Sequence, residues 1–414
     1  MTHSLSPISE ASNMPFDIKT RVKELEEELI ELRRDFHMHP ELGMAEHRTA
    51  GIVERYLKKL GLEVSRMCGT GVIGLLRGRQ PGKTLMMRAD MDALPIEEMT
   101  GLDFKSKTPG VMHACGHDGH TSMMMIAAKI LTENKNNLKG DIKFVFQPNE
   151  ENGCALDMVQ DGVMQNPTVD AVIGTHLMTG LPTGAISADD GPVMAEANVF
   201  RLTLQGLGGH TAVPEDSIDP ILAAASVVQQ VQAIQTRELS PHKSVAIVFG
   251  SIHAGTVANI IPEKVELHGT LRCLFNSREE PGENVLDRFE RIVSNICAAH
   301  RVGYELEWTF HDPAVVNDPA VSAVVRNAAA DVIAGTSQKI VPYVTMIGED
   351  FCRFSQEVPG TFYFVGVANK EKKTDFPHHH PSFDIDEDGL ATGVELHVTS
   401  AIHYLNGCVQ NTPN

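Results

Sequence analysis

The chain concentrates groups that can bind metal ions in one short stretch, VMHACGHDGHTSMMM, residues 111–125. Within eight consecutive positions it places three histidines, one cysteine and one aspartate: His113, Cys115, His117, Asp118 and His120. Imidazole and thiolate donors suit Zn, Mn, Co or Ni, whereas Mg and Ca prefer shells made of oxygen. The following run, residues 121–133, predicts a helix, whose positive N-terminal end would favour the thiolate form of Cys115. The stretch therefore predicts metal chemistry beside the start of a helix.

Four apolar, strand-like segments lead into polar groups of the same kind. Residues 84–90 lead to Asp90 and Asp92, 143–147 to Glu150 and Glu151, 170–176 to His176, and 361–368 to the histidines at 378–380. Open α/β sheets bind ligands outside the carboxyl ends of their strands, so we expect these groups at one edge. Singly, His176 is typical of a loop histidine, the glutamates of a solvated pair, and Cys115 of a small buried hydrophobe. Their convergence on one edge favours a metal site.

The number of candidate ligands indicates two ions rather than one. A single catalytic tetrahedral ion uses three protein ligands and keeps one position for water. One thiolate, one carboxylate and three imidazoles exceed that need, whereas two ions that share a bridging ligand would use them all. Glu150, next to a liganding Glu151, would then be free to take a proton from an activated water.

The elements that must position these groups follow from periodicity. Residues 19–36 carry apolar side chains at helical spacing between charges, which predicts an amphipathic surface helix. Strand-like and helix-like segments then alternate, which predicts an α/β fold with a mostly parallel sheet and helices on both faces. Between residues 197 and 310 the order becomes β-α-β-β-α-β, the ferredoxin-like pattern of an inserted α+β domain. We therefore expect a catalytic, metal-binding domain from residues 1–196 and 311–414, and a separate domain at 197–310.

Length, charge and cysteine content narrow the class of protein. A chain of 414 residues usually forms more than one domain. With 35 basic and 54 acidic residues the net charge is −19, which argues against nucleic acid or an anionic membrane as a partner. Seven cysteines without a repeated close spacing indicate a reducing compartment. The polar first residues lack a signal-peptide pattern and no apolar run approaches about 18 residues, so we expect a cytoplasmic protein.

Six motifs in order carry a resemblance to a known family. They are RADMDALP at 88–95, MHACGHDGHT at 112–121, FQPNEENG at 146–153, THLMTGLPTG at 175–184, GLGGHTAVP at 206–214 and GEDF at 348–351. The chain resembles the metal-dependent M20 aminoacylase and peptidase family, in particular the amidohydrolase branch with hippurate hydrolases and indole-acetyl-amino-acid hydrolases. The resemblance covers nearly the whole chain and implies a zinc-peptidase-like catalytic domain.

The resemblance also implies roles for single residues and a cofactor. It implies two divalent ions per subunit, with Zn or Mn ahead of Co or Ni, and Cys115 as the ligand they share. The remaining ligands would be His117 and His176 on one ion, and Glu151 and His379 on the other. Glu150 is then the general base, and Asp92 orients a ligand. In the inserted domain, His210 would assist the site of a partner subunit, while Asn259 and Arg272 would grip the substrate carboxylate.

The predicted reaction is hydrolysis of an N-acyl amino acid to a carboxylic acid and a free amino acid, by a homodimer or higher oligomer. Leu207 and Glu215 depart from residues that the family often has, which leaves substrate preference open. Three alternatives remain: a dipeptidase or carboxypeptidase of the same fold, a catalytically silent metal-binding homologue, and a thiol enzyme with Cys115 as nucleophile.

Overall fold

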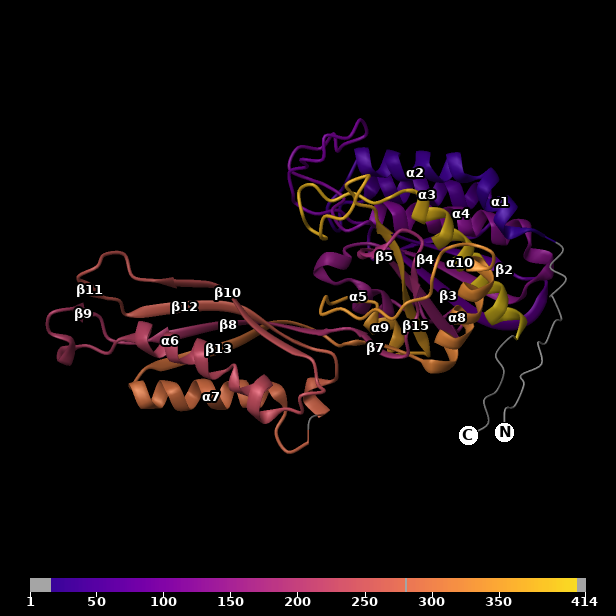
Figure 1. Ribbon diagram of the computed structural model, residues 1–414. Helices are drawn as coiled ribbons and strands as arrows, with labels where there is room; N and C mark the ends of the chain where they lie inside the picture. The colour runs from indigo at the N-terminus through magenta and orange to yellow at the C-terminus, as the bar shows by residue number, and fades with distance from the viewer. Residues whose placement is uncertain (1–15, 280, 408–414) are drawn as a thin grey trace.

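The computed structural model describes residues 16–279 and 281–407 (Figure 1). A large α/β body contains both ends of the described chain, and a long, narrow unit projects from it. The polar N-terminal stretch used above to judge signal peptides lies outside the described residues as far as residue 15. Among the described residues, no helix is both long and apolar enough to cross a bilayer.

The large body is built on one sheet of seven strands. The strands are β1 (Glu63–Met67), β2 (Gly71–Arg77), β3 (Gln80–Asp90), β4 (Lys139–Gln147), β5 (Ala171–Pro182), β6 (Ile186–Ser187) and β15 (Gly360–Ala368). Their order is β1-β2-β4-β3-β5-β15-β6. The four central strands run parallel, whereas β1, β2 and β6 pair antiparallel at the edges. The predicted α/β fold with a mostly parallel central sheet is confirmed.

Helices cover both faces of this sheet (Figure 1). One face packs against α1 (Ile18–Glu24), α2 (Glu26–Met38), α3 (His47–Lys59), α4 (His117–Glu133), α8 (Pro319–Ile333) and α10 (Asp388–Asn406). The other packs against the short helices α5 (Ala155–Gln160) and α9 (Cys352–Ser355). Successive side chains of a strand alternate between faces, so Leu85 and Met87 join the first core and Met86 the second. Burial on both faces explains why successive residues 85, 86 and 87 of β3 are all apolar, without the alternation of a half-exposed strand.

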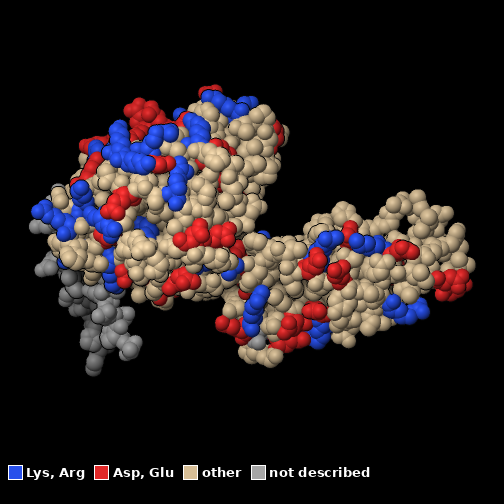
Figure 2. All heavy atoms as spheres, turned by 180° about the vertical axis from the view of Figure 1, so that it is seen from behind, with Lys and Arg blue, Asp and Glu red and all other residues tan. Residues whose placement is uncertain are grey.

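The projecting unit, called the extension below, comprises residues 196–312. Its elements are β8 (Glu196–Gln205), α6 (Pro220–Gln230), β10 (Val245–Ala254), β12 (Lys264–Cys273), α7 (Val285–His300) and β13 (Gly303–Asp312). The four strands form an antiparallel sheet of order β10-β12-β8-β13, and side chains of both helices pack with it in one hydrophobic core. The β-α-β-β-α-β order predicted for 197–310 is therefore present. The small strands β9 (Gly209–His210) and β11 (Ile260–Ile261) pair at its far end. Figure 2 shows the extension from behind, with broad areas free of charged side chains.

The helix predicted for residues 19–36 is divided at Leu25, where the backbone has φ −102° and ψ 4° and separates α1 from α2. The apolar stripe on both helices is buried as expected, but Arg33 on the same stripe is fully buried as well. Its guanidinium contacts Asp118 at 2.9 Å, Asp384 at 2.6 Å and Glu387 at 3.2 Å. A buried cation with three carboxylate partners ties α2 to the start of α4 and to the C-terminal segment.

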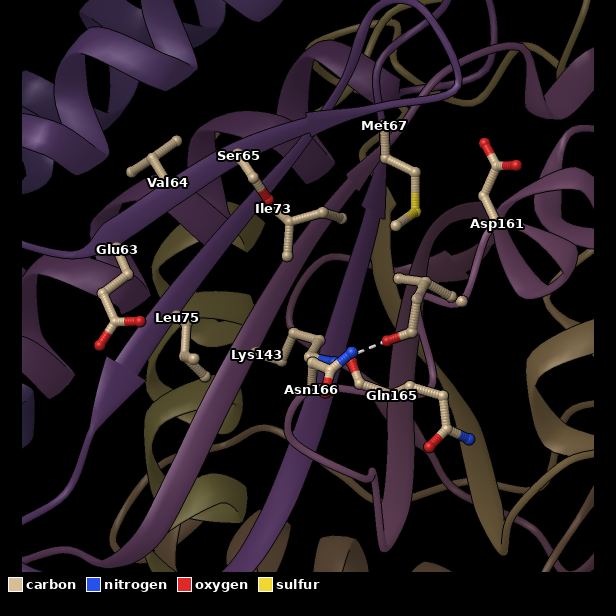
Figure 3. A pocket seen from close by; sticks show the side chains of 12 residues that line it. Glu63, Val64, Ser65, Met67, Ile73, Leu75, Lys143, Asp161, Gln165 and Asn166 are labelled. Carbon is tan, nitrogen blue, oxygen red and sulfur yellow. Dashed lines mark hydrogen bonds between the residues drawn. The ribbon is translucent and has the colours of Figure 1, made fainter.

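A cavity of about 310 Å³ lies on the sheet face near β1 and β2 (Figure 3). Lys143, which is 3% exposed, reaches across its floor and donates to the carbonyl oxygens of Val163, Gln165 and Pro167 at 2.7, 2.7 and 3.1 Å. These three bonds match the three N–H donors of the ammonium group. We therefore regard Lys143 as a clamp on the segment that leads into β5.

Candidate metal centre and active site

The start of α4 sets the direction of His117. Gly116 precedes the helix with φ +91°, a conformation that glycine adopts without steric cost, so the chain turns sharply between Cys115 and His117. His117 Nδ1 donates to the backbone oxygen of Asp92 at 2.9 Å. This bond leaves Nε2 as the ring nitrogen that faces the site, within 3.9 Å of Glu150 Oε2.

The paired glutamates lie on a short turn after β4. Asn149, just before them, has φ +52°, which is uncommon for a residue with a side chain. The backbone N–H groups of Glu150 and Glu151 donate to the two carboxylate oxygens of Asp92 at 3.0 and 3.2 Å. Asp92 therefore positions both glutamates.

Two further imidazoles come from distant segments. His176 in β5 donates from Nδ1 to the backbone oxygen of Leu177 at 2.8 Å, and its Nε2 lies 3.4 Å from Cys115 Sγ. His379 has φ +65°, its N–H donates to Ala114 O at 2.8 Å, and its Nε2 lies 3.3 Å from Glu151 Oε1. Backbone strain of this kind is characteristic of functional positions.

The neighbours of His379 have other contacts. His378 Nε2 donates to the backbone oxygen of Leu177 at 2.9 Å, while the ring of His380 stacks on Phe376 at 4.8 Å. Of the three adjacent histidines, His379 is therefore the one whose ring nitrogen lies beside Cys115 and Glu151.

The donor atoms form two groups that fit two cations. Cys115, His117 and His176 form one group and Cys115, Glu151 and His379 the other, with all donor atoms of a group within 4.8 Å of one another. The thiol belongs to both groups, as a bridging ligand would. His117 Nε2 and Glu151 Oε1 are buried without a hydrogen-bond partner among the described residues, although buried polar atoms are nearly always paired. Cations between these atoms would satisfy them.

The protein's own charges make this region strongly negative. Burial lowers the pKa of His117, but the carboxylates of Asp90 and Asp92 outweigh burial and raise it to about 10. Burial raises the pKa of Glu150, and the nearby Glu349 and Glu151 raise it further. Such a field favours bound cations.

The prediction that Cys115, just before α4, is a thiolate is wrong when only the protein's own charges act on it. Burial raises the pKa of the Cys115 thiol, and the carboxylates of Glu151 and Glu150 raise it further. The helix end is a partial charge, whereas two carboxylates are full charges at close range. A thiolate at Cys115 would therefore need a cation beside it.

A cavity of about 240 Å³ opens beside the two donor groups. Arg272 of β12 lines it together with Phe310 and Ile347. Arg272 Nη1 donates to Met346 O at 3.0 Å, and no carboxylate among the described residues forms an ion pair with it. The extension thus delivers an unpaired cationic side chain to the same cavity as the metal-ligand candidates.

The ten residues predicted for the site fall into two places. Eight meet around this cavity: Asp92, Cys115, His117, Glu150, Glu151, His176, Arg272 and His379. His210 and Asn259 instead lie at the far end of the extension, in or beside β9 and β11 (Figure 1). There the Thr211 N–H donates to the Asn259 backbone oxygen at 3.3 Å, so these two predicted residues lie beside each other.

Comparison with known proteins decides the family. The profile of peptidase family M20/M25/M40 matches residues 86–403, which include every site residue predicted above. The chain belongs to this family. It is 39% identical to thermostable carboxypeptidase 1 of Saccharolobus solfataricus over 94% of this chain and 98% of that protein. N-acetyl-L-cysteine deacetylase of Bacillus subtilis is 37% identical over 92% of this chain and 88% of that protein.

A solved structure agrees with these relatives. The crystal structure of the Bacillus subtilis YXEP protein, described as a dinuclear metal-binding peptidase from the M20 family, matches with TM-score 0.79 and 32% identity over 93% of this chain and 99% of that one. The M20 membership predicted from the motifs is confirmed, and the protein is a metal-dependent, amide-cleaving hydrolase.

This M20 hydrolase has a second set of charged groups behind the donor atoms that the sequence reading left without a role. Arg88 in β3 is fully buried and contacts Asp90 at 2.7 Å, Glu349 at 2.9 Å and Asp350 at 3.0 Å. Burial raises the pKa of Glu349 to about 8 despite the guanidinium. The available signal was an arginine inside the buried strand TLMMRAD together with the acidic pair in GEDF.

Proposed function

We propose that this M20 hydrolase cleaves the amide bond of N-acyl amino acids and releases a carboxylic acid and a free amino acid. The observation that carries the proposal is the unpaired Arg272 in the cavity that also contains the two donor groups. A planar guanidinium binds a carboxylate with two parallel hydrogen bonds. A substrate with a free carboxylate near its amide would therefore be oriented between Arg272 and the metal ligands.

Two divalent cations, Zn or Mn ahead of Co or Ni, would be held by the two donor groups that share Cys115. When bound, such ions polarise the amide carbonyl and make a water molecule more acidic. The ligand assignment is His117 and His176 for one ion, Glu151 and His379 for the other. Because Cys115 must stay reduced to serve both, we expect the protein to work in a reducing compartment such as the cytoplasm.

Glu150 would move the proton. Its carboxylate lies 3.9 Å from His117 Nε2, lines the cavity and is held by Asp92 through the backbone. As general base it takes a proton from the attacking water, and as general acid it passes that proton to the leaving nitrogen. The raised pKa that its surroundings impose suits a group that must both accept and release a proton.

His210 and Asn259 would act on the cavity of a second copy. Within one chain they lie at the far end of the extension, away from Arg272. A homodimer through the extension would carry them to the partner, where His210 would assist the oxyanion and Asn259 the substrate carboxylate. Support for such an interface comes from β10, an edge strand of its sheet with exposed Val248 and Ile252.

A carboxypeptidase or dipeptidase activity is the second candidate. The relative from Saccharolobus solfataricus carries the carboxypeptidase name, and a C-terminal residue presents the same amide and carboxylate as an N-acyl amino acid. Only the group on the acyl side differs.

A hydrolysis screen tests both activities. Metal-loaded protein, with Zn, Mn, Co and Ni tried in turn, is given acetyl, benzoyl, indole-acetyl and aminobenzoyl amino acids beside dipeptides and longer peptides. The proposal expects turnover of at least one acyl amino acid above any peptide. Faster cleavage of peptides would favour the carboxypeptidase or dipeptidase activity. No turnover of any substrate by protein with bound metal would favour a catalytically silent metal-binding homologue.

A further inference from the structure

A chain of buried hydrogen bonds leads from Arg88 to His176. Arg88 Nη1 donates to Asp90 Oδ2 at 2.7 Å, and Asp90 Oδ1 accepts from His120 Nδ1 at 2.7 Å. His120 Nε2 then accepts the backbone N–H of Leu177 at 2.9 Å. The Leu177 carbonyl oxygen in turn accepts from His176 Nδ1 at 2.8 Å.

Sheet geometry explains why this contact is needed. β3 pairs with β5 only as far as Gly174, so the side of β5 that faced β3 is open from there onward. The Leu177 N–H lies beyond that point and would be a buried, unpaired donor without His120. His120 replaces the missing strand neighbour at the position where β5 delivers His176.

The bonds also fix which nitrogen of each ring carries hydrogen. Since His120 Nε2 accepts from an N–H, that nitrogen is bare and Nδ1 carries the hydrogen donated to Asp90. Since His176 Nδ1 donates to a carbonyl, its Nε2 is the bare nitrogen, 3.4 Å from Cys115 Sγ. A bare Nε2 is what a metal ligand requires.

His120 is itself one of a group of three with Asp90 and His117 that is spaced for a metal ion. Both of its ring nitrogens are already used, and Asp90 is bonded on both oxygens. This group therefore supports the site and does not compete for an ion.

We propose that His120 is a positioning residue, which holds the Leu177 backbone so that His176 presents Nε2 to the metal that it shares with Cys115 and His117. The inference rests on the proposed role of His176 as a ligand. It predicts that the acceptor on His120, and not the bulk of its ring, controls metal affinity at that position.

Two substitutions of His120 separate its role as hydrogen-bond acceptor for Leu177 from its role as donor to Asp90. His120→Gln can place an oxygen near the Nε2 position and keep the acceptor for Leu177, whereas His120→Asn can keep a donor to Asp90 but does not reach Leu177. We expect His120→Gln to keep metal affinity within about threefold of the native protein, and His120→Asn to lose about 10–100-fold at one of two sites. Titration calorimetry with Zn²⁺ and the visible absorption of the Co²⁺-loaded protein measure this without any substrate.

The controls keep the two proposals apart. His403→Asn alters another largely buried histidine, which lies on α10 and contacts Asp331 of α8 at 3.2 Å, and this change should leave metal binding unchanged. His176→Ala should abolish one metal equivalent; full binding there would refute its role as a ligand and the proposed metal centre with it. If His176→Ala loses metal while folded His120→Asn binds two equivalents with native affinity and a native Co²⁺ spectrum, the inference about His120 is wrong. If His120→Asn does not fold, His120→Gln still tests the inference: loss of metal affinity in the folded His120→Gln protein, which keeps the acceptor, would show that the inference about His120 is wrong.

Discussion

The carboxylate of Asp92 holds the backbone of Glu150, whose N–H donates to Asp92 Oδ1 over 3.0 Å. The same carboxylate accepts the N–H of Glu151, and the Asp92 backbone oxygen accepts from His117 Nδ1. One residue just beyond the end of β3 therefore fixes the proposed base and one proposed ligand of each ion. This arrangement explains how Asp92 positions two glutamates that lie nearly 60 residues further along the chain.

Replacing Asp92 by Asn should loosen both glutamates. One oxygen becomes an NH₂ group that would face a backbone N–H, so one of the two bonds is lost. We expect metal affinity to fall by about 10–100-fold, which is typical when a partner of a ligand is changed. Calorimetric titration with Zn²⁺ or Mn²⁺ measures it, with the exposed Asp103→Asn as control. Native affinity in the folded Asp92→Asn protein would contradict the role given to Asp92.

Replacing Glu150 by Gln should separate chemistry from metal binding. The amide has nearly the same shape but cannot take a proton at neutral pH, so kcat should fall by about 10²–10⁴-fold while the metal content stays unchanged. Metal analysis and kcat on the best substrate of the screen give the two numbers. Glu371→Gln, on an exposed loop, is the matched control. Retained turnover would remove Glu150 from catalysis, and loss of metal would make it a ligand.

The sequence predicts the meeting of distant strands because the carboxyl ends of parallel strands share one edge. Asp92 and Glu151 follow two such strands, His176 lies within a third, and the fold brings them together. The role of His120 was not predictable in this way, because its acceptor matters only where β5 has lost β3 as a neighbour. Such a local end of strand pairing depends on register, which periodicity does not give.

The extension shows a different limit. Its order of elements is readable from apolar periodicity. The resemblance assigns Asn259 and Arg272 to the grip on one substrate carboxylate, and His210 to the site of a partner subunit. Within one chain the structure separates Arg272, at the near end of β12, from Asn259, which lies at the far end of the extension beside His210. β12 is an extended strand of ten residues. Residues near its two ends are close in sequence but are separated in space by the length of the strand.

Arg272→Met should weaken binding of substrates that carry a free carboxylate. Loss of the pairing between the guanidinium and the substrate carboxylate should increase KM by about 10–100-fold, with a smaller change in kcat. The same substrates with the carboxylate converted to a carboxamide should show little difference between native and variant protein. Arg201→Met, on an exposed position of β8, controls for the loss of a positive charge. Equal losses on carboxylate and carboxamide substrates would indicate that Arg272 only supports the loop at Met346.

Removal of metal should abolish activity, and addition of Zn²⁺ or Mn²⁺ should restore it. The alternative of Cys115 as a nucleophile predicts activity that survives a chelator, since a thiol enzyme needs no ion. The raised pKa of the Cys115 thiol in the protein's own field favours the metal-dependent outcome. The measurement is turnover before chelation, after dialysis, and after reconstitution, with circular dichroism to verify the fold. Full turnover in metal-free protein would support the thiol mechanism.

Lys143→Met should reduce stability without altering the metal centre. The side chain has a similar length, but the three carbonyl oxygens of residues 163, 165 and 167 lose their shared donor. Val163 is buried, so its oxygen would stay unpaired, whereas Gln165 is exposed and can bond to water. We therefore expect the free energy of unfolding to fall by about 1–3 kcal/mol, measured by urea denaturation. Lys139→Met, exposed on the same strand, should change it by less than about 0.5 kcal/mol. An equal effect of the two substitutions would show that the clamp contributes nothing beyond a surface lysine.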